Sequence, residues 1–258
     1  MSHAFAIAAQ TFKESVRDRV LYSLIAFALL MIGAAILFGA ISVGIREMVL
    51  VNLGLSCISI FGLLIAIFIG ISLVWKEIDR RTIYNILSKP VSRAEFIIGK
   101  YCGLLLTLVV NTAVMTAGFY AALFYEKGTL GLQDLAPLQA VYFILLQLAI
   151  VVGLALVFST ISTPILSAVF TFSLFVIGNF LEDLRGFGEH TGSAVAAKLT
   201  EFLYYALPNF SDFNVIMSAA HGEQAPGYLA LSNSLYALLY VVVLLSAAIL
   251  IFEEREFQ

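Results

Sequence analysis

The stretch MVLVNLGLSCISIFGLLIAIFIGISLV, residues 48–74, decides the fold class of this chain. It contains no Asp, Glu, Lys, Arg or His, and it exceeds the about 20 apolar residues that a helix needs to cross a bilayer. Further windows that satisfy or approach this criterion are Val20–Ala40, Tyr101–Tyr125, Leu138–Phe158, Pro164–Leu181 and Leu231–Phe252. We therefore predict an all-α integral membrane protein with six transmembrane helices.

The composition supports this class. The chain has 258 residues, of which 61% are hydrophobic and 12% are charged, and its mean hydropathy is +1.00. Soluble domains average roughly 45–50% apolar residues, so the surplus must face lipid. The net charge of -3 gives no reason to expect nucleic-acid binding. Cys57 and Cys102 lie at different membrane depths, which favours small buried hydrophobes over a disulfide. We interpret residues 1–258 as a single transmembrane domain.

The distribution of Lys and Arg predicts the orientation. Six spans place both termini on one side of the membrane, together with the loop at residues 75–100. That side carries ten of the 14 basic residues, and the other side carries four. By the positive-inside rule, both termini and this loop are cytoplasmic, and residues 182–230 lie outside. We expect a multi-pass protein of the inner (cytoplasmic) membrane.

The six windows contain no Asp, Glu, Lys, Arg or His. Ion-coupled transporters commonly carry such groups inside the membrane, and intramembrane proteases need a Ser/His pair, an Asp pair or a metal cluster. His3, His190 and His221 all fall outside the windows. The pattern indicates helices that move with energy supplied from outside the membrane spans. We expect this energy to enter at the cytoplasmic surface.

Residues 1–19 precede the first span. Phe5, Ala9, Phe12 and Val16 recur at helical spacing, and charged side chains occupy the remaining arc. This pattern predicts an amphipathic helix along the inner interface. Such a helix serves either as a membrane anchor or as a partner-docking elbow, and the pattern does not separate the two.

The loop at residues 75–100 holds the most specific local signals. Apolar residues at helical spacing predict a short helix at its start, which Lys89-Pro90 then breaks. Ser92 and Glu95 have the spacing of a capping box, which predicts the start of a new helix. The hydrophobic-staple positions on either side are Val91 and Phe96.

The new helix is predicted to run from Arg93 to about Tyr125. Its length is about 50 Å, whereas the hydrocarbon core is only about 30 Å thick, so the helix must project into the cytoplasm or tilt. Gly99 and Gly103 form a small-xxx-small pair that allows close helix packing. The loop and this helix are either an ordered docking element or a basic loop that only sets topology.

Three segments of the loop resemble the cytoplasmic loop of ABC-2 type transporter permeases. They are Glu77-Ile78-Asp79-Arg80-Arg81-Thr82, Leu87-Ser88-Lys89-Pro90-Val91-Ser92-Arg93 and Gly99-Lys100. The chain departs from the family pattern at Arg81, where Gly is usual. The six-span layout, the N-terminal helix and a Leu207-Pro208-Asn209 element before the last span are similar as well. Within the family, the chain is most similar to the nitrous-oxide or multicopper maturation permeases.

The resemblance implies a mechanism. Two permease chains pair, as a homodimer, and each binds a cytoplasmic ATP-binding subunit that holds ATP and Mg²⁺. The loop acts as a coupling helix that enters a cleft on this ATPase, and the pair exports a substrate. The coupling residues carried over from the family are Glu77, Arg80, Thr82, Lys89, Pro90, Arg93 and Lys100. The chain itself has Ala94 where a phosphate-binding loop ending in Gly99-Lys100 would need Gly, so we expect no cofactor in it.

The outer segment, residues 182–230, is too long for a simple connection. Val195, Leu199 and Phe202 predict an amphipathic re-entrant or interfacial helix that ends before Pro208. The acidic residues near His190 match no metal-ligand spacing, which favours a solvated face. A gate at the outer mouth is the functional alternative for the segment.

Two other functions stay open. A non-transporting mechanotransmission or scaffold subunit, which passes ATPase work to an outer partner, needs the same coupling surface. An intramembrane protease would have to use Glu253-Glu254, but no helix follows this pair. The sequence does not identify a substrate.

Overall fold

The computed structural model describes residues 3–42, 44–79, 92–129, 131–190 and 194–254, and the regular structure in these ranges is helical. In chain order the elements are α1 (His3–Val16), α2 (Arg19–Ile41), α3 (Arg46–Asp79), α5 (Arg93–Lys127), η1 (Leu132–Leu135), α6 (Ala136–Ile161), α7 (Pro164–Asn179), α8 (Leu181–His190), α9 (Ala194–Ala206), η2 (Ser211–Phe213), α10 (Ile216–Ala220) and α11 (Gly227–Glu254). The predicted all-α class is confirmed.

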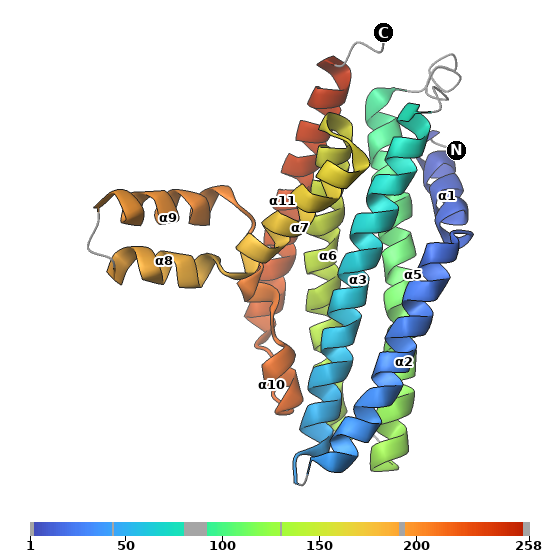
Figure 1. Ribbon diagram of the computed structural model, residues 1–258, viewed down its shortest axis with the longest axis vertical. Helices are drawn as coiled ribbons and strands as arrows, with labels where there is room; N and C mark the ends of the chain where they lie inside the picture. The colour runs from blue at the N-terminus through green and yellow to red at the C-terminus, as the bar shows by residue number, and fades with distance from the viewer. Residues whose placement is uncertain (1–2, 43, 80–91, 130, 191–193, 255–258) are drawn as a thin grey trace.

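The long helices form one elongated bundle (Figure 1). Within the described residues, α2, α3, α5, α6 and α11 are each long and apolar enough to cross a membrane. Helices α3 and α6 bury most of their apolar windows, whereas α2 and α11 expose most of theirs. Because a lipid-facing helix needs no protein cover on its apolar side, this division is typical of a membrane-spanning bundle.

The two ends of the bundle differ in what they carry. Helix α5 begins and α11 ends at one end, which we call the terminus end (Figure 1). The connections from α2 to α3 and from α5 to η1 lie at the opposite end, which we call the far end. The predicted tight turn between the fourth and fifth windows is confirmed, because α6 ends at Ile161 and α7 begins at Pro164.

The fifth predicted window, Pro164–Leu181, is not one straight helix. Helix α7 ends at Asn179 after 16 residues, or about 24 Å, which is short of the about 30 Å hydrocarbon core. The chain then bends by 59° into α8, so this pair is a broken span or a re-entrant loop, and the described residues hold five spans, or six if the bent pair counts as one. The Gly178 carbonyl accepts a hydrogen bond from the Phe210 N–H at 2.9 Å, so the returning chain takes the place of a further helical turn.

Helices α8 and α9 form a hairpin that projects from the side of the bundle (Figure 1). The Arg185 guanidinium lies 4.9 Å from the centre of the Tyr204 ring and joins the two helices. Helix α9 confirms the predicted helix that ends before Pro208. Helix α8 falls where the sequence analysis expected only a solvated face.

Candidate functional site

Three of the seven predicted coupling residues lie in the part of the chain that the structure describes. Glu77 lies in the last turns of α3, which continues past the second predicted span to Asp79. Arg93 and Lys100 lie in the first turns of α5. The remaining predicted residues, Arg80, Thr82, Lys89 and Pro90, lie outside the described residues. The site is therefore built from the terminus end of α5 and from the helices packed against it.

The predicted capping box fixes the start of α5. The Glu95 N–H donates to Ser92 Oγ at 3.2 Å, and the Ser92 N–H donates to Glu95 Oε2 at 3.0 Å. These bonds satisfy two backbone donors that a helix start otherwise leaves unpaired. The helix that follows the predicted coupling loop therefore has a sharply defined first residue.

Phe96 packs against the end of α11. Its ring stacks on Phe252 with the centroids 5.7 Å apart, and these two side chains form a small core with Ile97 and Ala248. We call these four residues the terminus-end core. Val91, its predicted staple partner, lies outside the described residues.

Arg93 adds a polar contact to the same junction. Its Nη1 donates to the Phe252 carbonyl oxygen at 2.8 Å. The last carbonyls of a helix have no partner within that helix, and a cation near them is favourable. The first turn of α5 and the last turns of α11 are thus joined by both aromatic packing and a charge-assisted hydrogen bond.

Gly99 and Gly103 bring α1 onto α5. A Cβ atom on Gly99 would lie 2.8 Å from the Ala4 carbonyl oxygen, and one on Gly103 would lie 2.6 Å from the Ala8 carbonyl oxygen. Real side chains do not approach backbone this closely, so these positions need glycine. The small-xxx-small pair noted in the sequence therefore brings α1 and α5 together.

Helix α1 has a protein-facing side that the sequence analysis did not find. Thr11 and Ser15 are buried, whereas Phe5 of the predicted apolar stripe is exposed. The side that meets α5 combines Ile7 with small residues that fit the glycines there, so it differs from the predicted apolar stripe. The remaining apolar stripe is free to meet lipid.

Lys100 is a buried cation. Its side chain is only 2% exposed, and Nζ lies 5.8 Å from the centre of the Phe96 ring. This distance permits a cation–π contact. Lys100 therefore lies behind the surface of the bundle, next to the terminus-end core.

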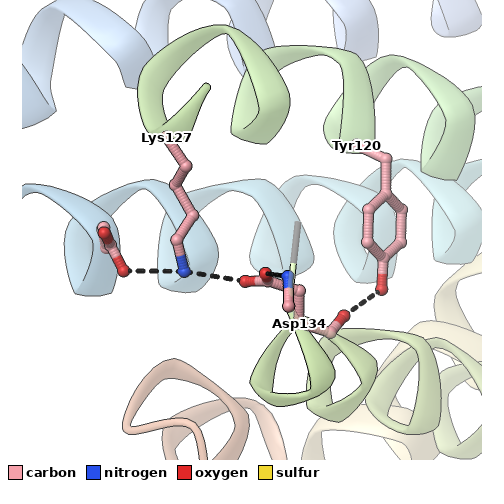
Figure 2. A network of polar contacts seen from close by, with 5 residues as sticks. Tyr120, Lys127 and Asp134 are labelled. Carbon is pink, nitrogen blue, oxygen red and sulfur yellow. Dashed lines mark hydrogen bonds and ion pairs between the residues drawn. The ribbon is translucent and has the colours of Figure 1, made fainter. Parts of the chain in front are cut away.

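The far end of α5 is held by ion pairs and hydrogen bonds instead (Figure 2). Lys127 Nζ contacts Asp134 Oδ1 at 2.8 Å and Glu47 Oε2 at 3.0 Å. Asp134 Oδ2 also accepts from the Gly131 N–H at 2.6 Å, and the Tyr120 hydroxyl donates to the Asp134 carbonyl at 2.7 Å. This cluster was not predicted from the sequence, because Glu47 is distant in sequence from Lys127 and Asp134.

Burial alone would raise the pKa of Asp134, but the hydrogen bonds from Lys127 and from the Gly131 N–H outweigh it. The net result is a pKa below the ordinary value of 3.8. Asp134 is therefore an ionised anchor of the connection between α5 and α6.

The Leu207-Pro208-Asn209 element is fastened to α11. The Asn209 N–H donates to the Tyr236 hydroxyl at 2.9 Å, and Asn233 Nδ2 donates to the Asp212 carbonyl at 2.8 Å. Asn209 Nδ2 also donates to Asp212 Oδ2 at 3.1 Å, and burial raises the pKa of that carboxyl group. The outer segment thus contains an ordered part beside the last span as well as the projecting hairpin.

Comparison with known families fits this architecture. A family described as ABC-2 family transporter protein matches residues 5–257. The chain belongs to the ABC-2 transporter family. Its long apolar helices and this family make it a multi-pass membrane protein, the permease part of a transporter. The match does not reach the level of a subgroup, and no curated protein sequence matches the chain.

Proposed function

We propose that this chain is the permease subunit of an ATP-driven exporter, and that two copies work with separate ATP-binding subunits docked at the terminus end. The observation that carries the proposal is the start of α5. It lies inside the predicted coupling loop, residues 75–100, and it is packed against both α1 and α11. A force applied to this loop would therefore reach three helices together.

Helix α5 is suited to carry such a force across the membrane. It runs without a break from Arg93 to Lys127, which is about 52 Å at about 1.5 Å per residue. Its far end is connected through Lys127 to Glu47 of α3 and to Asp134 of η1. Movement at the terminus end would thus be transmitted to the connections at the far end.

Helix α1 offers a second surface for the ATP-binding subunit. A surface hollow of about 510 Å³ lies along its polar side and is lined by Gln10, Lys13, Glu14 and Arg17 among others. Because Gly99 and Gly103 hold α1 against α5, a partner that binds here would act on the same unit as the coupling loop. This arrangement favours the docking elbow over a simple anchor.

Lys100 has a positioning role in this proposal. It lies beside Phe96 and is shielded from the surface, so it would support the packing of the coupling helix rather than touch the ATPase. The surface contacts would come from Glu77, Arg80, Thr82, Lys89 and Pro90, with Arg93 at the junction to α11.

Charge reversal at the loop tests the proposal. Lys89→Glu should reduce capture of the ATP-binding subunit from solubilised membranes by about tenfold or more, since it places a like charge in a complementary interface. Lys198→Glu on α9, which makes the same change on the exposed hairpin, should leave capture unchanged. If both variants are inserted in the membrane and capture the ATP-binding subunit equally, the loop is not the coupling site.

A further inference from the structure

A groove at the far end has the shape and chemistry of a lipid site. We propose that it binds one bilayer phospholipid with a phosphoethanolamine head group, holding an acyl chain between α2, α3 and α10. The head group then lies beside Arg46 and Glu47. This inference does not depend on the proposed function.

The groove has an apolar part of about 390 Å³. Phe38 and Ile41 of α2, Val49 and Leu53 of α3, and Met217 of α10 contribute to its walls. Asn52 Nδ2 donates to Met217 Sδ at 3.8 Å, which holds α10 against α3 and closes one side. These walls follow the last turn of α2 and the first turns of α3, so the groove extends from the far end toward the middle of the bundle.

A polar hollow of about 500 Å³ adjoins the apolar part. Arg46, Glu47 and His221 contribute to its lining. Ile45 and Met48 line both spaces, so the two are adjacent. An apolar groove beside a charged hollow at the ends of membrane-spanning helices matches the order of chain and head group in a phospholipid.

The charged side chains that line the hollow determine which lipid head group it should prefer. The Arg46 side chain is 54% exposed, and its contact with Glu126 is long, at 3.8 Å. The Glu47 side chain is 60% exposed and shares Lys127 with Asp134. One accessible cation and one accessible carboxylate therefore line the same hollow, which suits a phosphate and an ammonium group in one molecule.

The ammonium group should be a primary one. A primary ammonium has three N–H donors for the Glu47 carboxylate, whereas a choline head group has none. An anionic head group such as phosphoglycerol would satisfy Arg46 but bring no second cation to Glu47, which shares Lys127 with Asp134. The hollow should therefore prefer phosphoethanolamine over both.

Tryptophan quenching by brominated lipids tests this preference on the chain alone. The single tryptophan, Trp75, is first replaced by Phe. Phe38→Trp then reports on the groove, and Phe124→Trp is the matched control. Both phenylalanines are 54% exposed and lie three residues before the end of a far-end helix. Each variant is placed in phosphatidylcholine vesicles that contain brominated phosphatidylethanolamine, phosphatidylglycerol or phosphatidylcholine.

We expect the Phe38→Trp variant to bind phosphatidylethanolamine about threefold more strongly than the other two lipids, the size of effect that one exposed ion pair gives. The Phe124→Trp variant should show no preference. Adding Glu47→Gln or Arg46→Gln should abolish the preference, and Leu53→Trp, on the other wall, should reproduce it. The proposal is overturned if both reporters rank the lipids equally, if phosphatidylglycerol is preferred, or if the charge variants leave the ranking unchanged. ATPase capture is measured separately, so failure of one proposal is distinguishable from failure of the other.

Discussion

The two ends of α5 are held by different kinds of contact. At Arg93 the helix is capped, stacked through Phe96 on Phe252, and pressed against α1 at two glycines. At Lys127 it is held by ion pairs with Glu47 and Asp134. The first end depends on shape, and the second end depends on charge.

This difference bears on how a membrane helix can transmit force. Interlocked packing resists small displacements because close-packed side chains have no room to move. The Lys127–Glu47 pair has an exposed partner, and such pairs contribute only about 0–1 kcal/mol each and tolerate changes of distance. The terminus end of α5 is therefore built as a rigid joint, and the far end as an adjustable one.

Removal of Phe252 should have the largest effect. Phe252 is buried in the terminus-end core, so Phe252→Ala should lower the free energy of unfolding by about 3–5 kcal/mol. Thermal unfolding in detergent measures this effect. Leu250→Ala, on the exposed side of the same helix, should change stability by less than about 0.5 kcal/mol. Similar melting temperatures for the two variants would show that the joint is not rigid.

A methyl group at Gly103 should have the next largest effect. Gly103→Ala should destabilise by about 1–3 kcal/mol, because the new Cβ would meet the Ala8 carbonyl. Gly33→Ala is the matched control, since a Cβ there meets nothing within 4 Å, and it should stabilise α2 by about 0.5–1 kcal/mol. Thermal unfolding should therefore shift in opposite directions for the two variants. Shifts of the same sign would contradict the close contact between α1 and α5.

The far end should respond to pH in a way that the terminus end does not. The folded-state pKa of Asp134 is below its ordinary value of 3.8, so the carboxylate contributes stability at higher pH. This contribution is lost as the pH falls below that value, because the unfolded chain then binds more protons. Thermal unfolding between pH 6 and about pH 3 should show the loss, on the scale of a single carboxylate. Asp134→Asn should remove this part of the pH dependence, and an unchanged profile would show that the ion pairs carry no stability.

Much of the rigid joint could be predicted from the sequence. Ser92 and Glu95 predicted the start of α5, and the long apolar runs predicted the membrane-spanning helices, because both signals are local. The partners of the joint were not predictable. Phe252 and Ala8 are far from Phe96 and Gly103 in sequence, and no local pattern marks which apolar residue meets which.

Two features away from this joint were harder to predict. Pro164–Leu181 looked like one span because hydropathy does not register that the Gly178 carbonyl bonds the distant Phe210 N–H. The Lys127, Glu47 and Asp134 cluster was missed because three charges outside the predicted spans resembled ordinary solvated residues, and Glu47 is far from the other two in sequence. Contacts that hydropathy does not register decide both features.

The most direct test of the account is a capture experiment. The chain is purified from its native membranes in mild detergent, and ATP hydrolysis is measured before and after high salt strips away bound proteins. We predict that a polypeptide with a phosphate-binding loop is captured in a stoichiometric amount, and that hydrolysis leaves with it. Hydrolysis that stays with the stripped chain, or the absence of any ATP-binding polypeptide beside a folded chain, would contradict the account.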